Sequence, residues 1–264
     1  MSEKSSDSIH HDADQGQGKL RCVFVHGWGM NSAIWQPFFD RLPEYIEPVC
    51  IDLPGHGECN QLSFYTLQDL TNHLIEQTKT LAEPVIWVGW SLGMLPVLQL
   101  AQQHPEKVSR LIAFSSNPCF VAGESWPHGV EEAVFDLFAE NLQADTEKTL
   151  QRFLSLQVQG MKDSRELLRQ LRKMISERGL PSAEALTAGL DVLKQTDLRE
   201  LVSQLDKPVD WWLGDKDALV PASLNDYLSC LSAVKSHIIA GAAHLPFISH
   251  ADQLLLGFLD FIND

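Results

Sequence analysis

One serine in this chain lies in a sequence pattern that is typical of a nucleophile. The run Val85–Gly93 is apolar and ends abruptly in G-x-S-x-G with Ser91 at its centre, and residues 94–103 then have the spacing of a helix. A strand, a tight turn and a helix in this order expose a serine hydroxyl above a sheet edge, close to the N–H groups of the helix N-terminus. We expect a Cβ at Gly89 or Gly93 to crowd the neighbouring strand or helix.

A serine hydroxyl needs a histidine base near neutral pH, and the base needs a carboxylate to orient it. In this architecture the acid and the base follow the serine in chain order, each after a late strand. Asp215 and Asp217 follow the apolar run 209–213, and we favour Asp217 as the acid. His244 lies in a turn of small residues after the last apolar run, so we favour it as the base over His250, which begins the final helix.

Acyl transfer also requires two donors for the negative charge that develops on the carbonyl oxygen. We assign these donors to two backbone N–H groups. One belongs to Leu92, directly after the nucleophile, and the other to Trp28, in the loop His26–Gly29 that follows the first strand. The indole of Trp28 is expected to form part of the wall of the acyl pocket as well.

The order of apolar runs predicts the elements that position these residues. Strands and helices alternate up to residue 118 and again after residue 200, which predicts an α/β fold with a mainly parallel sheet and helices on both faces. Such sheets bind ligands beyond the carboxyl ends of their strands. The predicted strands are 20–25, 48–53, 85–90, 108–115, 209–213 and 236–240, and the predicted core helices are 31–42, 67–81, 94–103, 222–231 and 251–262.

Residues 119–200 contain no strand pattern, and we predict a helical cap there. Its helices are expected at 130–142, 146–159, 164–178 and 182–195. The predicted organisation is therefore a disordered tail at 1–18, a core formed by 19–118 and 201–264, and a cap at 119–200.

Composition excludes several classes of function. The chain has 264 residues, of which 44% are hydrophobic and 21% charged, and no apolar run is long enough to span a membrane. The net charge of −15 argues against nucleic acid and anionic membrane as partners. The first 18 residues lack the apolar stretch of a signal peptide, and the five cysteines show no paired spacing. We expect a cytoplasmic monomer that uses no metal and no cofactor.

These segments together resemble a known family over nearly the whole chain from residue 20 onward. The segments that carry the resemblance are 26–31, 52–55, 87–93, 116–120, 152–157, 189–190, 196–199 and 242–250. The chain resembles the α/β-hydrolases and, more narrowly, the pimeloyl-[acyl-carrier protein] methyl ester esterases of biotin synthesis. The catalytic motifs would suit any esterase of the fold, whereas Arg152–Gln157, in the cap, is far more specific.

The resemblance implies a serine carboxylesterase with Ser91, Asp217 and His244 as its triad. The implied substrate is the methyl ester of a pimeloyl chain on acyl carrier protein, hydrolysed to free the pimeloyl carboxylate. Met94 follows the elbow where the family usually has a small residue, so the acyl pocket is expected to differ in shape. The implied substrate contacts are Trp28, Ser91, Leu92, Phe153, Leu154, Ser155, Leu156, Gln157 and His244.

Charge in the cap is opposite in sign to that of the whole chain. Residues 148–178 carry eight basic and three acidic residues, a net charge of +5. Such a run is often only a solvated face, but here it suits docking of a small acidic partner. The esterase family is thought to hold acyl carrier protein through cap arginines, which implies docking through Lys148, Arg152, Arg165 and Arg169. A predicted helix places Lys162, Arg165, Arg169 and Arg172 on one face.

Two other functions remain open at the level of sequence. One is a general short-chain carboxylesterase or another hydrolase of the same fold, and the other is a non-enzymatic relative that only binds ligands. The intact serine, aspartate, histidine and donor loop argue against the second. Dehalogenases and epoxide hydrolases of this fold need an acid at the elbow, so Ser91 excludes them.

Overall fold

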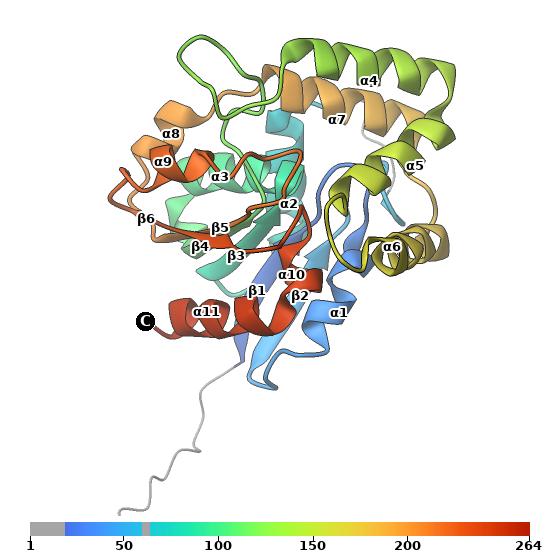
Figure 1. The fold of residues 1–264 in the computed structure, drawn as a ribbon. Coiled ribbons are helices and arrows are strands. Elements are labelled where there is room, and N and C mark those ends of the chain that lie inside the picture. The colour runs from blue at the N-terminus through green and yellow to red at the C-terminus, as the bar shows by residue number, and fades with distance from the viewer. Residues whose placement is uncertain (1–18, 60–63) are drawn as a thin grey trace, which may run out of the picture.

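The computed structural model describes residues 19–59 and 64–264, and the tail expected at residues 1–18 lies outside the described residues (Figure 1). Six parallel strands form one sheet in the order β2-β1-β3-β4-β5-β6, which confirms the predicted α/β class. The strands are β1 (Leu20–Val25), β2 (Ile46–Ile51), β3 (Val85–Trp90), β4 (Val108–Phe114), β5 (Val209–Gly214) and β6 (Val234–Ile239).

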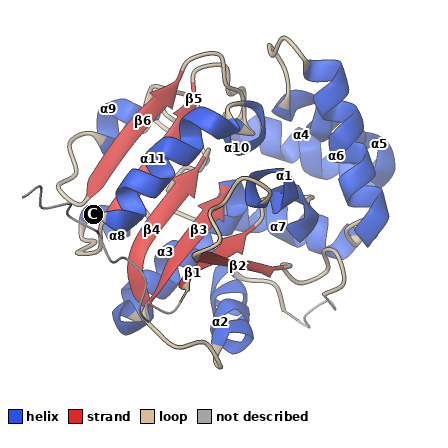
Figure 2. Ribbon diagram, turned by 90° about the horizontal axis from the view of Figure 1, so that it is seen from below, coloured by secondary structure: helices blue, strands red, loops and turns tan. Residues whose placement is uncertain are grey.

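Helices cover both faces of the sheet, as the alternation predicts (Figure 2). Successive side chains of a strand point to opposite faces, so Phe24 and Val25 belong to two separate hydrophobic clusters. The face that carries Phe24 packs against α1 (Gln36–Phe39), α10 (Pro246–Ser249) and α11 (Ala251–Asn263). The face that carries Val25 packs against α2 (Leu67–Thr78), α3 (Met94–Gln103), α8 (Arg199–Ser203) and α9 (Leu224–Leu228).

Several predicted elements differ in extent from the structure, among them the helix predicted over 222–231, which is the shorter α9, and the strand predicted over 236–240, which is β6. The helix predicted over 31–42 is a 3₁₀ turn, Ser32–Trp35, followed by the single turn α1. Pro37 accounts for the break, because proline is tolerated in a first helical turn but not within a longer helix. The second strand runs over 46–51 rather than 48–53. It lies at the edge of the sheet, where Pro48 need not donate to a further strand, and it begins where Ile46 pairs with Leu20.

Between β4 and β5, ahead of the short helix α8, the chain forms four helices that cover the carboxyl edge of the sheet (Figure 1). We call residues 119–200 the cap. Its helices begin and end at local signals: the Asp145 side chain accepts the N–H of Lys148, and Gly179, with a φ of +90°, follows the third helix. The four helices are α4 (Glu132–Ala144), α5 (Thr146–Gln157), α6 (Ser164–Arg178) and α7 (Ala183–Gln195), close to the predicted ranges. In the described part of the chain, none of the helices has both the length and the hydrophobicity that crossing a lipid bilayer requires.

Candidate active site

Ser91 lies on a strained turn directly after β3. Its φ is +53°, in the left-handed region that residues other than glycine rarely adopt. A Cβ on Gly89 would lie 2.5 Å from the Cα of Met94, and one on Gly93 would lie 2.4 Å from the carbonyl oxygen of His26. The expected crowding at both glycines is confirmed. The turn therefore holds the Ser91 side chain in one place at the edge of the sheet.

The order of the strands brings a second loop to Ser91. β1 and β3 are neighbours at the point where the strand order reverses, which is where open α/β sheets bind ligands. The loop after β1 consequently touches the turn after β3, and a Cβ on Gly27 would lie 3.1 Å from the Cβ of Ser91. Within the described residues, the backbone N–H of Trp28, the next residue in this loop, donates to no acceptor. The N–H of Leu92 belongs to the first helical turn directly after Ser91.

Asp217 and His244 meet in a buried pair. The Nδ1 of His244 donates to Oδ2 of Asp217 at 2.8 Å, and the side-chain exposures of the two residues are 1% and 0%. The other carboxylate oxygen of Asp217 accepts the N–H groups of Leu219 and Val220 at 2.8 and 3.0 Å. These three bonds hold the carboxylate in place and keep the ring proton on Nδ1, so Nε2 is the nitrogen with a free lone pair.

The two residues that were not favoured make other contacts. Asp215 accepts the backbone N–H of Gly241 at 2.6 Å and lies 3.8 Å from Nζ of Lys216, so it joins the loop after β5 to the loop after β6. His250 precedes α11, and its Nδ1 lies 2.8 Å from Oγ of Ser249. The structure thus pairs Asp217 with His244, and it places neither Asp215 nor His250 in that pair.

The outer nitrogen of His244 is available to accept a proton. Two hydrogen bonds hold the backbone of His244. The indole of Trp90 donates to the His244 carbonyl at 2.9 Å, and the His244 N–H donates to the Gln157 carbonyl at 3.2 Å. In the described part of the chain, the buried Nε2 has no hydrogen-bond partner, Ser91 included. Bonds between nucleophile and base are often completed only when substrate binds.

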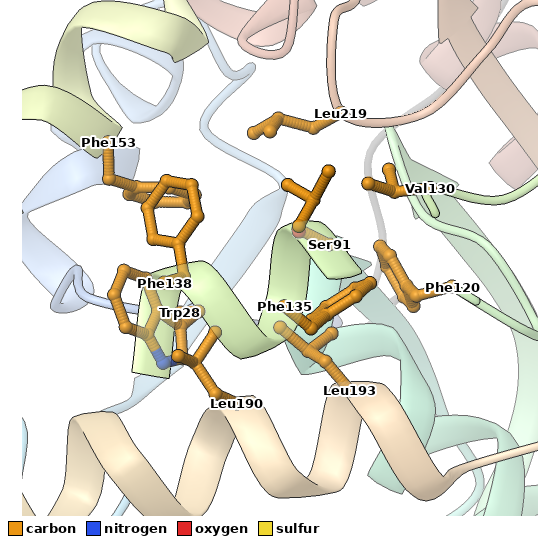
Figure 3. A pocket seen from close by; sticks show the side chains of 11 residues that line it. Trp28, Ser91, Phe120, Val130, Phe135, Phe138, Phe153, Leu190, Leu193 and Leu219 are labelled. Atoms are coloured by element: carbon orange, nitrogen blue, oxygen red, sulfur yellow. The ribbon is translucent and has the colours of Figure 1, made fainter. Parts of the chain in front are cut away.

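An apolar cavity of about 60 Å³ opens beside Ser91 (Figure 3). Trp28 and Leu219 of the core contribute to its wall, together with cap side chains from three helices. The edge of the Trp28 ring meets Phe153, with 4.6 Å between the ring centroids. None of the described residues that line the cavity is charged, so it suits an uncharged aliphatic group. The cap contributes Phe135 and Phe138 from α4, Phe153 from α5, and Leu190 and Leu193 from α7.

The five consecutive residues expected to contact substrate point in different directions. A helix turns once every 3.6 residues, so five successive side chains cannot line one cavity. Only Phe153 reaches the cavity wall. Leu154 is buried in the core, Ser155 is exposed and bonds back to the Gln151 carbonyl, and Leu156 lines a hollow on the outside of the cap. Gln157 is buried beside His244.

Met94 does not shape this cavity. It is fully buried at the start of α3, and its sulfur lies over Gly89, 2.8 Å from where a Cβ would stand. The side chain therefore fills space below the turn and takes no part in the cavity wall. The difference in sequence at Met94 thus brings no direct contact with the cavity.

The basic residues of the cap are distributed over several surroundings. Arg152 and Arg165 line one hollow of about 430 Å³ between α5 and α6, together with the apolar side chains of Leu156 and Leu168. Arg169 lies outside that hollow. Its guanidinium donates to Glu166 at 2.6 and 2.9 Å, and this contact raises the pKa of Arg169 and lowers that of Glu166 to about 2.

Neither Lys148 nor Lys162 lines this hollow. Lys148 is exposed in the first turn of α5. Lys162 precedes α6, which begins at Ser164, so the predicted helical face does not include it. Of the four residues expected to dock the carrier, Arg152 and Arg165 are therefore the two that share one hollow of the cap surface.

Sequence analysis missed a group of residues behind the donor loop. The imidazole of His26 is fully buried, and Leu53 donates its N–H to Nε2 at 2.9 Å, so the ring proton is on Nδ1 and is donated to the Gly27 carbonyl at 2.8 Å. Burial lowers the pKa of His26, against the influence of Asp52 and the Gly27 carbonyl, and the ring is uncharged at neutral pH. A polar side chain next to an apolar strand end was the signal available for it.

Solved structures resemble this fold at low sequence identity. An esterase from Exiguobacterium antarcticum has a TM-score of 0.83 at 19% identity, and the match covers 94% of each chain. The enol-lactonase from Burkholderia xenovorans LB400 has a TM-score of 0.80 at 18% identity, covering 96% of this chain and 95% of that one. These likenesses show the fold alone.

A family model described as the alpha/beta hydrolase fold matches residues 23–251, so the sheet, elbow and cap define an α/β-hydrolase. The pimeloyl-[acyl-carrier protein] methyl ester esterase of Methylococcus capsulatus is 39% identical over 241 residues, which cover 91% of this chain and 93% of the relative. The esterase of the same name from Edwardsiella ictaluri is 37% identical over 249 residues, covering 94% and 95%. The chain belongs to the family of pimeloyl-[acyl-carrier protein] methyl ester esterases and is a carboxylic ester hydrolase.

Proposed function

We propose that the chain hydrolyses the methyl ester of a pimeloyl chain carried on acyl carrier protein, with Ser91 as nucleophile, His244 as base and Asp217 as orienting acid. The observation that carries this proposal is the buried Asp217–His244 pair beside a serine with a positive φ, at the wall of an apolar cavity. The relatives named above carry this activity in their names. The products are the free pimeloyl carboxylate, still on its carrier, and methanol.

The reaction proceeds in two halves. Nε2 of His244 takes the Ser91 proton while Oγ attacks the ester carbonyl, and the N–H groups of Trp28 and Leu92 donate to the resulting oxyanion. The intermediate collapses with cleavage of the bond to methoxide, which leaves as methanol with the proton from His244. Water then attacks the acyl-enzyme by the same route. Its proton passes through His244 to Ser91 as the carboxylate is released.

The size and polarity of the cavity support a short aliphatic acyl chain. A cavity needs roughly 10–15 Å³ of volume to hold one atom of the size of a water molecule. About 60 Å³ therefore holds on the order of four to six heavy atoms. This is close to the aliphatic part of a pimeloyl chain and well short of a membrane fatty acid. Phe153 is the cap residue that we assign to this contact, and Gln157 adjoins His244 behind it.

Docking of the carrier is assigned to Lys148, Arg152, Arg165 and Arg169. Arg152 and Arg165 support it most directly, because both are exposed and share one hollow of the cap surface. An acidic partner would be repelled by most of a chain of net charge −15 and attracted to this surface. We further propose that the enzyme acts as a monomer in the cytoplasm, where the buried thiols of Cys22 and Cys119 would stay reduced.

A general short-chain carboxylesterase is the competing function, since the cavity by itself suits any short ester. Complementation of a biotin-requiring strain that lacks its own esterase separates the two. The wild-type chain should restore growth without biotin, and Ser91→Ala should not. The purified enzyme should cleave a carrier-bound pimeloyl methyl ester with a higher kcat/KM than p-nitrophenyl esters. Turnover of small esters without complementation and without cleavage of the carrier-bound ester would contradict the proposal.

A further inference from the structure

The loop that carries the Trp28 N–H is fixed from behind by the segment that follows β2. We call residues 26–32 the oxyanion loop. At its start, His26 accepts the N–H of Leu53, as described above. At its end, Ser32 donates its N–H to Oδ1 of Asp52 at 2.6 Å. The position of Trp28 between these two anchors therefore depends on where Asp52 and Leu53 lie.

A cap residue extends this network. Arg178, the last residue of α6, donates from Nη1 to Oγ of Ser32 at 2.8 Å, and its Nη2 lies 3.7 Å from Oδ2 of Asp52. The half-buried guanidinium thus contacts both members of the Ser32–Asp52 bond. Burial alone would raise the pKa of Asp52, but His26, Ser32 and Arg178 outweigh it and lower that pKa, so the carboxylate is charged at neutral pH.

The next cap helix contacts the middle of the same loop. The buried indole of Trp28 donates from Nε1 to the carbonyl of Leu186 in α7 at 2.8 Å. Gly189, one turn further along, allows α7 to lie flat against the ring, because a Cβ there would be 2.7 Å from Cδ1 of Trp28. The linker between α6 and α7 is itself tied to the core, since Ser182 donates its N–H to the Gly55 carbonyl at 2.9 Å.

We infer that α6 and α7 position the oxyanion loop, with Arg178 holding its end at Ser32 and Gly189 allowing α7 to hold it at Trp28. Arg178 and Gly189 are positioning residues, because neither lines the cavity nor touches the triad. The inference rests on the proposed function, in which the Trp28 N–H is one of two oxyanion donors. Through these two residues, α6 and α7 accordingly act on the position of the oxyanion loop and do not serve only to cover the substrate.

The expected loss follows from the geometry of oxyanion donors. Removing one donor outright costs about 10²–10³-fold in kcat. Arg178 acts through Ser32 and Asp52, and the loop keeps its other anchors, so Arg178→Gln should lower kcat about 10-fold. KM for a small ester should stay within about 2-fold, because the cavity wall is intact. Affinity for a boronic acid, whose tetrahedral adduct with Ser91 places an oxygen in the oxyanion hole, should fall in parallel with kcat.

The experiment compares Arg178→Gln with Arg172→Gln, an exposed arginine on the same helix. Both variants and the wild type are titrated with a fluorophosphonate to count active sites, and their thermal melting is recorded. kcat and KM are then measured on p-nitrophenyl butyrate, together with boronate affinity. Arg172→Gln should match the wild type. Gly189→Ala should show the same fall in kcat and boronate affinity as Arg178→Gln, and Arg178→Lys should lie in between.

The inference is overturned if folded Arg178→Gln keeps wild-type kcat and boronate affinity per titrated site, or if Arg172→Gln loses as much. Should Arg178→Gln not fold, Gly189→Ala decides, and unchanged kcat and boronate affinity in it overturn the inference. Failure of the proposed function looks different, because the wild type would then not cleave the carrier-bound pimeloyl ester, whatever Arg178→Gln does to kcat on p-nitrophenyl butyrate.

Discussion

At the carboxyl edge of the sheet, backbone atoms of neighbouring loops come into close contact, whereas the wall of the cavity that the cap covers is made of side chains. Gly93 and Gly214 each lie where a Cβ would be 2.4 Å from a carbonyl oxygen of a neighbouring loop. The cavity wall, in contrast, is built from side chains such as Phe135, Phe153 and Leu190. Backbone contacts at such distances admit only glycine, while an apolar wall accepts many residues of suitable volume. The edge can therefore hold the reacting groups in one geometry, while the side chains of the cavity wall can vary with the substrate that is selected.

The largest expected effect tests the edge. Ser91→Ala and His244→Ala should each lower kcat by about 10³-fold or more, and Asp217→Asn by a comparable factor, because the three side chains act as one unit. If the edge sets the reaction, the loss should be equally severe for a carrier-bound ester and for a small soluble ester. Thermal melting should show that each variant remains folded.

Matched controls for this prediction lie beside the triad. Asp215→Asn and His250→Ala remove the same groups from positions outside the Asp217–His244 pair, and both should retain activity close to that of the wild type. An active His244→Ala together with an inactive His250→Ala would contradict the assignment of the base. An active Asp217→Asn beside an inactive Asp215→Asn would do the same for the acid.

A second, smaller effect concerns stability in acid, which should depend on buried histidines of the core and not on the cap. Among the described residues, His26 and His56 have no exposed surface, and both belong to the core, whereas His128 is the one histidine in the cap sequence. Burial lowers the pKa of His56 to about 3 and lowers that of His26 as well. Unfolded histidines titrate near 6.5, so below that pH the unfolded chain binds protons that the folded chain excludes. The free energy of unfolding should consequently fall as pH drops from about 6.5.

The expected slope is about 1.4 kcal/mol per pH unit for each such histidine until its folded pKa is reached. Asp52, whose pKa is lowered, contributes stability above its unfolded pKa near 3.9 and loses it only on further acidification, so it does not affect the slope between pH 6.5 and 5. Urea unfolding at pH 7.5, 6 and 5 measures the slope. His56→Gln should be less stable at pH 7.5 but less sensitive to acid, and an unchanged slope would contradict the prediction.

The contrast between local motifs at strand ends and contacts between distant segments explains how far function could be predicted from the sequence. Ser91, Asp217 and His244 were identifiable because each follows a strand in a short segment with a fixed chain order. Contacts between distant segments leave no such periodic signal. Arg178 touches Ser32 across 146 positions of the chain, and in the sequence it was one basic residue among eight. The cap segment 153–157 was assigned to the substrate only by resemblance. In the structure its side chains point in different directions around α5, and only Phe153 among them lines the cavity.

The helix ends show a similar division. Proline and capping residues act locally, so α6 and α7 were predicted to within a residue, and Pro37 accounts for the break that was missed. The first and last residues of β2 and β6 depend on pairing with a neighbouring strand. Their ends were shifted by one or two residues, because register is set by the partner strand and not by the strand itself.

The smallest expected effect tests the cap as the region that selects the substrate. Reversing Arg152 and Arg165 to Glu should raise KM for a carrier-bound ester about 5-fold. Exposed charge pairs are individually weak, but together they accelerate encounter with a partner of opposite sign. kcat on a small soluble ester should not change, because neither residue reaches the cavity beside Ser91. Arg169→Glu should have a smaller effect than Arg165→Glu, because the charge of Arg169 is already matched by Glu166.

Salt and a distant charge reversal supply the controls. Added salt should weaken the wild-type reaction with the carrier-bound ester and leave the small ester unaffected, since exposed charges are screened over about 10 Å at 0.1 M. Lys235→Glu makes the same change of charge on the edge strand β6, outside the cap, and should leave KM for the carrier-bound ester unchanged. Equal slowing of both substrates by the Arg152 and Arg165 reversals would show that these arginines support the cap structure. If neither substrate is slowed, the basic face is merely solvated, and selection of the carrier-bound ester must then come from the cavity wall and from the positions of α6 and α7.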